Sequence, residues 1–313
     1  MSNLTEKPKV VAVVGPTASG KTNVSINLAK KIGGEIISAD SMQIYKGIHI
    51  ASAAPDAEEM QGIPHHLLEF LDLTQEFSVA DYVKLARAKI SEIQSVGKVP
   101  IVVGGTGLYI SALLDNTKFV EAETDEVLRK ELENEFDRVG AEEMLNRLRE
   151  FDPVSADRLS KGDKRRIIRC FEVFKTTGKT VTEQNELSRL EPADFEALVF
   201  GITYLDREKL YERINLRVDL MLKNGLVKEA ETTLSAQSGK GAYQAIGHKE
   251  IYVYLKDECS LEQAAELLKQ QTRRYAKRQL TWFRRDSRIN WLYPDSGEDF
   301  TDKAIETAKK FLN

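Results

Sequence analysis

The eight residues from Gly15 to Thr22, GPTASGKT, constrain the fold of this chain more than any other segment. They fit the pattern G-x-x-x-x-G-K-[ST], in which backbone N–H groups turn inward around phosphate oxygens, the lysine adds a positive charge and the last hydroxyl can bind Mg²⁺. A valine-rich run, Lys9–Val14, precedes the loop, and a helical pattern, Lys21–Lys31, follows it. A strand, a Gly-rich loop and a helix in this order predict a phosphate site at one edge of a parallel sheet. The predicted phosphate-binding residues are Gly15, Pro16, Thr17, Ala18, Ser19, Gly20, Lys21 and Thr22.

After this loop, short apolar runs alternate with helical patterns. Ser78 and Asp81 form the S-x-x-D pattern that starts a helix. The alternation predicts a parallel α/β sheet, whose ligand crevice lies at the carboxyl ends of the strands. The predicted segments are a strand at Glu35–Ala39 that ends at Asp40, a helix at Ser78–Val96, and a strand at Val99–Val103 that runs into Gly104–Gly107.

The character of the sequence changes after Asp115. From Glu121 to about Arg189 the chain is strongly charged and helical by period, with no strand-like run. The fold predicted is therefore α/β, with a P-loop NTPase or kinase-like parallel-sheet core and an inserted all-helical domain. The core is predicted to comprise residues 1–118 and 196–313, and the insertion residues 119–195. The later core elements are predicted as a strand at Ala197–Tyr204, helices at Arg207–Asn224 and after Ser260, and a strand at Ile289–Leu292.

Composition excludes several classes of protein. Of the 313 residues, 42% are hydrophobic and 30% are charged, and no apolar run approaches the ~20 residues that span a bilayer. The N-terminal residues lack the apolar core of a signal peptide. Cys170 and Cys259 are far apart without zinc-type spacing, and the four histidines form no metal signature. We therefore expect a cytoplasmic protein with no membrane partner, in which His65–His66 lies in a surface loop or has a packing role.

Charge is unevenly distributed along the chain. The net charge is −4, yet the segment 269–288 carries eight basic residues and a single acid, Asp286. A basic stripe on an acidic protein can bind phosphates, although a lone charge run is often only a solvated helix face. The basic residues are Lys269, Arg273, Arg274, Lys277, Arg278, Arg284, Arg285 and Arg288.

Asp40 ends a predicted strand and is therefore expected near the phosphate loop. A carboxylate there can hold Mg²⁺ or accept a proton from a nucleophile, or it can only cap the turn Ser41–Gln43. The loop itself is shared by NTPases, GTPases and small-molecule kinases. The chain has no N-K-x-D guanine-binding motif, and no hydrophobic strand after the second helix ends in the usual Walker-B aspartate.

Six further motifs accompany the loop. They are ISADSMQIYKG (Ile37–Gly47), PHHLL (Pro64–Leu68), VGGTGLY (Val103–Tyr109), RRIIRCFEVF (Arg165–Phe174), GKTVTE (Gly178–Glu183) and TRRYAKRQLTWFR (Thr272–Arg284). The set resembles the tRNA dimethylallyltransferase family, also called tRNA isopentenyltransferases, in its bacterial form. The resemblance runs from Val10 to about Leu292 in the family order, whereas a kinase would share only the first motif.

The resemblance implies a reaction and the residues that perform it. The donor is dimethylallyl pyrophosphate, held by the loop with Mg²⁺ at Thr22. The acceptor is the exocyclic amine of the adenosine immediately 3′ of the anticodon, in tRNAs that read codons beginning with U. Asp40 is the base that takes the amine proton, and Thr106 lies near the adenine. Arg217 stabilises the leaving pyrophosphate, with Arg213, one turn away, as the other candidate.

The resemblance also implies contacts with a tRNA anticodon stem-loop, whose reacting base must be splayed out. Gln43 is expected to bond one edge of that base, although it can equally be an ordinary polar loop residue. Basic residues of the insertion and of the late helix are expected to contact phosphates and to give a steep salt dependence. The expected tRNA-binding residues are Asp40, Ser41, Met42, Gln43, Thr106, Arg165, Arg166, Arg169, Arg273, Arg274, Lys277 and Arg278.

Two positions depart from the family pattern. Relatives usually read G-T-A-K-P where this chain has Ala51-Ser52-Ala53-Ala54-Pro55, and they usually have a tyrosine at the position of His248. These departures bear on contacts with the acceptor more than on the chemistry of the donor. The zinc-finger extension of eukaryotic relatives does not appear, which fits a bacterial form, and a monomer is expected.

Two other functions are compatible with the loop. One is an ATP-dependent small-molecule kinase in which Asp40 is the base for a hydroxyl, but a small substrate needs neither the late basic stripe nor the cluster Arg165–Arg169. The other is a non-catalytic RNA-binding P-loop protein, but binding alone does not require both Lys21 and Asp40 at the phosphate crevice.

Overall fold

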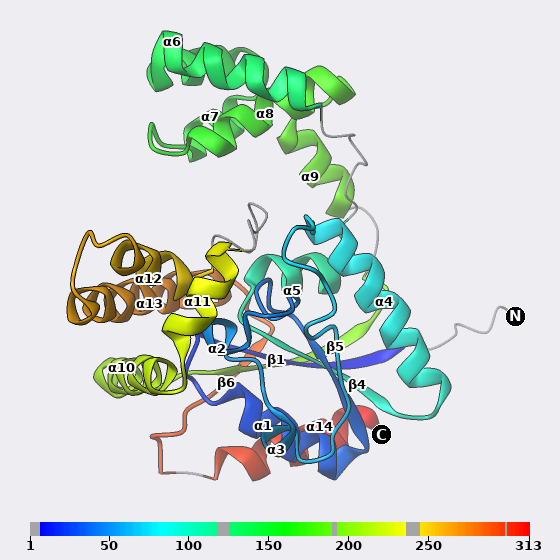
Figure 1. The fold of residues 1–313 in the computed structure, drawn as a ribbon. Coiled ribbons are helices and arrows are strands. Elements are labelled where there is room, and N and C mark those ends of the chain that lie inside the picture. The colour runs from blue at the N-terminus through cyan, green and yellow to red at the C-terminus, as the bar shows by residue number, and fades with distance from the viewer. Residues whose placement is uncertain (1–6, 118–124, 190–192, 236–244, 298) are drawn as a thin grey trace, which may run out of the picture. The chain divides into compact units, whose positions relative to one another are not determined.

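The computed structural model describes residues 7–117, 125–189, 193–235, 245–297 and 299–313, and the chain divides into two compact units (Figure 1). The first unit comprises Met1–Leu114 and Asp194–Asn313, and the second comprises Asp115–Ala193. The expected start of the insertion at residue 119 lies outside the described residues. The phosphate loop and the strands around it belong to the first unit.

A six-stranded sheet forms the centre of the first unit, in the order β3-β2-β4-β1-β5-β6, and every neighbouring pair is parallel. The predicted parallel α/β fold is thus confirmed. β5 ends at Ile202, two residues before the predicted Tyr204, because its pairing with β1 stops at Gly201, where the phosphate loop begins, and its pairing with β6 stops at Ile202. The strands are β1 (Lys9–Val14), β2 (Gly34–Ser38), β3 (His65–His66), β4 (Val99–Gly104), β5 (Glu196–Ile202) and β6 (Ile289–Leu292).

His65 and His66 do not lie in a surface loop. They form the edge strand β3, paired with Ile36 and Ile37 of β2, and the His66 ring bonds the Glu35 carboxylate at 2.7 Å. Both histidines are half-buried. A two-residue strand carries no periodic pattern, so only its pairing partner reveals it.

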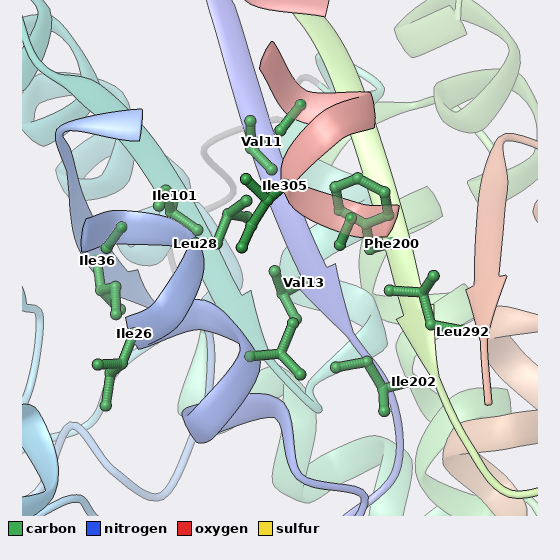
Figure 2. Close-up of a cluster of buried hydrophobic side chains, with 14 residues drawn as sticks. Val11, Val13, Ile26, Leu28, Ile36, Ile101, Phe200, Ile202, Leu292 and Ile305 are labelled. Carbon is green, nitrogen blue, oxygen red and sulfur yellow. The ribbon is translucent and has the colours of Figure 1, made fainter. Parts of the chain in front are cut away.

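One face of the sheet is covered by α1 (Lys21–Ile32) and α14 (Phe300–Leu312). Figure 2 shows the buried side chains between them, in which alternate strand residues such as Val11 and Val13 meet the apolar stripe of α1. The opposite face carries α4 (Val79–Ser95) and α5 (Gly107–Leu114), where the rings of Tyr82 and Tyr109 stack at 4.2 Å. The capping box predicted at Ser78 and Asp81 is present.

Further helices of the first unit flank the carboxyl ends of the strands. A buried cluster that includes Val218, Leu226, Ile251 and Leu268 joins the later four of them. The helix predicted after Ser260 begins with the expected capping box to Gln263. These elements are α2 (His49–Ser52), α3 (Ala57–Met60), α10 (Arg207–Lys223), α11 (Leu226–Ser235), α12 (His248–Leu255) and α13 (Leu261–Phe283).

The described part of the second unit is all-helical, with its own buried cluster around Leu132, Leu148, Ile168 and Phe171. Asp152 stabilises it locally: its buried carboxylate caps α7 and also bonds the backbone N–H and the hydroxyl of Thr182. The helices are α6 (Glu126–Phe151), which bends at Gly140, α7 (Pro153–Arg158), α8 (Lys164–Thr177) and α9 (Val181–Arg189).

Candidate active site

The phosphate loop connects β1 to α1 at the carboxyl edge of the sheet. Gly20 precedes α1 in the left-handed conformation, with φ 96°, and no side chain caps the helix. The first N–H groups of α1 therefore point into the loop without a side-chain partner, at the positive end of the helix dipole. This geometry suits an anion such as phosphate or pyrophosphate.

Side chains from both sides fix the backbone of the loop. The Lys21 Nζ donates to the carbonyl oxygen of Pro16 at 2.8 Å, and the Arg213 Nε donates to that of Ala18 at 3.0 Å. Ala18 itself has φ 61°, a conformation that alanine rarely adopts. Arg213, from α10, thus stabilises the loop from its outer side, where it is exposed to solvent.

A cavity of about 250 Å³ opens beside the loop. Its polar wall includes Lys21, Thr22, Asp40 and Arg217, which come from α1, the loop after β2, and α10. Lys21, Thr22 and Arg217 also line a second cavity of about 580 Å³ on the side of the loop where Arg213 lies. The structure therefore brings Arg217, and not Arg213, into the cavity that holds Asp40. The apolar wall of the first cavity includes Ile36, Met42, Ala51, Val218, Met221 and Ile246.

Two cations and one carboxylate share this cavity. Burial, followed by the repulsion of Arg217, lowers the pKa of Lys21 to about 8, although Asp40 opposes the shift. Burial also lowers the pKa of Arg217, against the attraction of Asp40 and Glu59. Two positive charges around one negative charge leave an excess of positive charge, which a bound pyrophosphate would neutralise.

Inorganic pyrophosphate is expected to bind less tightly as the pH rises through about 8, because Lys21 is cationic below that pH and neutral above it. A charge-assisted hydrogen bond contributes about 1.5–3 kcal/mol. The measurement is calorimetric Kd from pH 6.5 to 9.5 for wild type and Lys21→Met, since their ratio cancels the titration of pyrophosphate itself. The advantage of the wild type should be about 10-fold or more at low pH and shrink above pH 8. A ratio that stays constant over this range would contradict the prediction.

The carboxylate of Asp40 is oriented by its own loop. Its Oδ1 accepts the Met42 N–H at 2.9 Å, and among the described residues no group bonds Oδ2. Thr106, after β4, accepts the Ser41 N–H at 3.0 Å on Oγ1, and its own N–H donates to the Ala39 carbonyl. Asp40, which lines the cavity, thus caps the turn through Oδ1 and has Oδ2 without a partner among the described residues. Thr106 contacts the Asp40 loop, although it is not among the residues that line the cavity.

Gln43 is engaged inside the protein at both ends of its amide. The Ser38 hydroxyl donates to its Oε1 at 2.8 Å, and its Nε2 donates to the carbonyl of Ala53 at 3.2 Å. One N–H and one lone pair of the amide remain available. The contact predicted between Gln43 and a base would have to use these.

The two departures from the family pattern lie against each other. Glu229 of α11 accepts the N–H groups of Ile50 and Ala51 at 2.6 and 2.9 Å and also bonds His248 Nε2 at 2.8 Å. His248 is fully buried. The segment that begins at Ala51 and the His248 ring are therefore connected through the Glu229 carboxylate. This carboxylate supports the part of the cavity wall that α2 forms.

The predicted basic residues differ in their availability. On α13, Arg274, Lys277 and Arg278 are exposed, whereas Arg273 is half-buried and bonds Asn215. In the second unit, Arg165, Arg166 and Arg169 are all exposed on α8. Arg166 contacts Asp163, and Arg169 contacts the buried Glu172.

Two residues of α13 that the sequence analysis did not single out belong to the site. Tyr275 and Gln279 both line the first cavity, one helical turn apart. They lie within the motif TRRYAKRQLTWFR, between its basic residues. Their spacing of four residues, on a stripe of the helix next to that of Arg274 and Arg278, was the available signal.

The donor set was also compared with what a metal ion needs. The described residues include no group of three or more His, Cys, Asp or Glu side chains that could enclose a metal. Mg²⁺ is usually bound through one or two protein oxygens, phosphate oxygens and waters. The Thr22 hydroxyl at the cavity fits that requirement.

In the described part of the chain, no helix has the length and apolar character to cross a membrane.

The chain is similar to known proteins along most of its length. A family model described as IPP transferase matches residues 43–286. A tRNA dimethylallyltransferase of Acetivibrio thermocellus is 48% identical over 305 residues, which cover 97% of each chain. The Bacillus subtilis tRNA dimethylallyltransferase is 46% identical over 291 residues, covering 93% of this chain and 92% of that one.

Solved structures show the same relationship. The full-length tRNA isopentenylpyrophosphate transferase of Bacillus halodurans superposes with a TM-score of 0.72 at 40% identity, covering 98% of this chain and 96% of the other. A eukaryotic dimethylallyltransferase solved in the course of acting on tRNA superposes with a TM-score of 0.83 at 30% identity, covering 97% and 79%. Because the family model spans most of the chain and the relatives align along nearly all of it, this chain belongs to the IPP transferase family.

Proposed function

We propose that this chain transfers the dimethylallyl group of dimethylallyl pyrophosphate to the exocyclic amine of the adenosine immediately 3′ of the anticodon, in tRNAs that read codons beginning with U. The observation that carries the proposal is the shared cavity of Lys21, Arg217 and Asp40. Two cations beside an anion-binding loop suit a pyrophosphate leaving group, and the carboxylate suits removal of a proton. The relatives named as tRNA dimethylallyltransferases support the same reaction.

In the proposed reaction, a carbon–nitrogen bond forms between the adenine amine and the allylic carbon as the bond from that carbon to the pyrophosphate oxygen breaks. The amine is a poor nucleophile because its lone pair is delocalised into the ring. Asp40 accepts the amine proton as the new bond forms, an effect worth about 10²–10⁴ in rate. Lys21, Arg217 and the first N–H groups of α1 stabilise the negative charge that develops on the pyrophosphate.

Mg²⁺ is the proposed cofactor, with Thr22 as its protein ligand beside the pyrophosphate oxygens. When bound, the ion neutralises part of the charge of the leaving group. The apolar wall formed by Val218, Met221 and Ile246 is proposed to receive the five-carbon group and to exclude water from the reacting carbon.

The acceptor is proposed to bind through the Asp40 loop and through exposed basic residues. The flipped base is proposed to lie among five residues, Asp40, Ser41, Met42, Gln43 and Thr106. The insertion, residues 119–195, is proposed to contact the tRNA, and the protein is proposed to act as a cytoplasmic monomer. The proposed phosphate contacts are Arg165, Arg166, Arg169, Arg273, Arg274, Lys277 and Arg278.

The test uses the protein, Mg²⁺, radiolabelled dimethylallyl pyrophosphate and tRNA from cells that lack this modification. Label should appear in the tRNA, and a matched transcript with guanosine in place of the adenosine 3′ of the anticodon should remain unlabelled. If no tRNA is labelled and the protein transfers phosphate from ATP to a metabolite, the kinase function replaces this proposal. Equal labelling of both transcripts would reject the proposed acceptor position.

A further inference from the structure

Gln279 connects two loops that the proposed reaction needs. Its Oε1 accepts the Thr17 N–H of the phosphate loop at 2.9 Å, and its Nε2 donates to the Gly105 carbonyl, after β4, at 2.9 Å. The side chain is only 6% exposed. The two loops follow neighbouring strands, so one amide from α13 spans the carboxyl edge of β1 and β4.

The chemistry of an amide matches the two loops. Thr17 presents a donor and Gly105 presents an acceptor, and an amide offers an acceptor and a donor on one carbon. A carboxylate would repel the Gly105 carbonyl, and an apolar side chain would leave both backbone groups without their partner. A Cβ at Gly105 would lie 2.2 Å from Gln279 Nε2, so any larger residue there would displace this amide from its present position. The preceding Gly104 is packed equally tightly against the backbone of Ala39, in front of Asp40.

The contacts continue from Gln279 to the proposed base. Burial and the charge of Asp40 raise the pKa of Tyr275, one turn earlier on α13, while its polar neighbours Thr106 and Gln279 oppose the shift. Thr106 Oγ1 in turn bonds the N–H of Ser41, which is adjacent to Asp40. α13 therefore bonds the phosphate loop directly and reaches the loop that would carry the base through the segment Gly105–Thr106.

We propose that Gln279 is a positioning residue for the transfer reaction, which sets the distance between the phosphate loop and the Thr106–Asp40 segment. This inference rests on the proposed function. Because Gln279 uses the Thr17 N–H, the pyrophosphate has to be bound by N–H groups that follow Thr17, at the start of α1. Both ends of the Gln279 amide are occupied by the two loops in this arrangement.

Two variants separate positioning from general stability. Gln279→Met has a similar length and makes neither bond, and Gln279→Glu keeps the acceptor but loses the donor. Ser111→Ala is the matched control, because it removes the 3.1 Å bond from Trp282 of the same helix to α5 without touching the loops. The measurements are kcat and tRNA Kd, the Kd of inorganic pyrophosphate by calorimetry, and the exchange rate of the Thr17 amide hydrogen by NMR.

For Gln279→Met we expect kcat to fall about 10- to 100-fold, because misplacing reacting groups by an ångström has effects of this size. Pyrophosphate should bind about 3- to 10-fold less tightly, and the Thr17 amide should exchange about 10-fold faster, as for the loss of one hydrogen bond. The tRNA Kd should change by less than about 2-fold. In Ser111→Ala, kcat, both Kd values and the Thr17 exchange rate should likewise change by less than about 2-fold. If the methionine variant does not fold, Gln279→Glu should still lower kcat, because it loses the bond to the Gly105 carbonyl, while the Thr17 amide, whose acceptor it keeps, should exchange at about the wild-type rate.

Wild-type kcat in both Gln279 variants, or a Thr17 amide that exchanges equally fast in the wild type and in Gln279→Met, would overturn the inference. Equal losses in Ser111→Ala would also overturn it, since they would indicate a general effect of α13 on stability. Pyrophosphate binding and amide exchange do not depend on transfer. If the wild type labels no tRNA, the proposed function fails while these two measurements still decide the role of Gln279.

Discussion

Asp40→Asn is expected to lower kcat for dimethylallyl transfer about 10²- to 10⁴-fold, the usual contribution of a positioned general base. Asparagine keeps an oxygen for the Met42 N–H, so the turn after β2 should remain intact. It cannot accept the proton of the amine. The Kd for tRNA and for pyrophosphate should therefore change little, and single-turnover kinetics with labelled donor would separate the chemical step from binding.

Asp72→Asn is the matched control for this variant. Asp72 is exposed and pairs only with Lys46 and neighbouring groups at the surface, so its loss should leave transfer unchanged. If Asp40→Asn keeps both the wild-type kcat and the wild-type affinity for tRNA, Asp40 is only the cap of the turn that follows it. If its kcat is normal and tRNA binds more weakly, the carboxylate reads the base and does not take its proton.

The second large effect is expected for Arg217→Gln, which should lower kcat/KM for dimethylallyl pyrophosphate about 10²- to 10³-fold. Effects of this size follow the loss of a donor directed at developing negative charge. Arg213→Gln should cost about 3- to 10-fold, because it removes one hydrogen bond to the carbonyl of Ala18 from the outside of the loop. Steady-state kinetics of the two variants make the comparison, since both residues are on α10 and one turn apart.

The pH dependence of pyrophosphate binding gives an independent test of the two arginines. Arg217 helps to hold the pKa of Lys21 down, so in Arg217→Gln that pKa should rise above about 8. The pH at which pyrophosphate affinity declines should move upward with it, while Arg213→Gln leaves that pH unchanged. A larger loss of kcat/KM in Arg213→Gln than in Arg217→Gln would reverse the assignment of the two arginines.

The sequence alone determined the fold class and the position of the phosphate loop. Both depend on local patterns: a buried strand, a Gly-rich loop and a helix follow directly along the chain, and the periods of two and 3.6 residues identify most of the other elements. The placement of Asp40 near Lys21 also followed, because the carboxyl ends of parallel strands share one edge of the sheet. The family motifs then named a reaction that geometry alone would have left open.

Only the tertiary structure distinguished Arg217 from Arg213, because which of two arginines on one helix reaches the cavity that holds Asp40 depends on how that helix packs. The same holds for β3, whose two residues become a strand only beside β2, and for the meeting of His248 with the α2 segment through Glu229. Gln279 is the clearest case. It lies 262 residues from the Thr17 N–H that it bonds, and no local pattern encodes a contact that exists only after α13 has packed against the sheet.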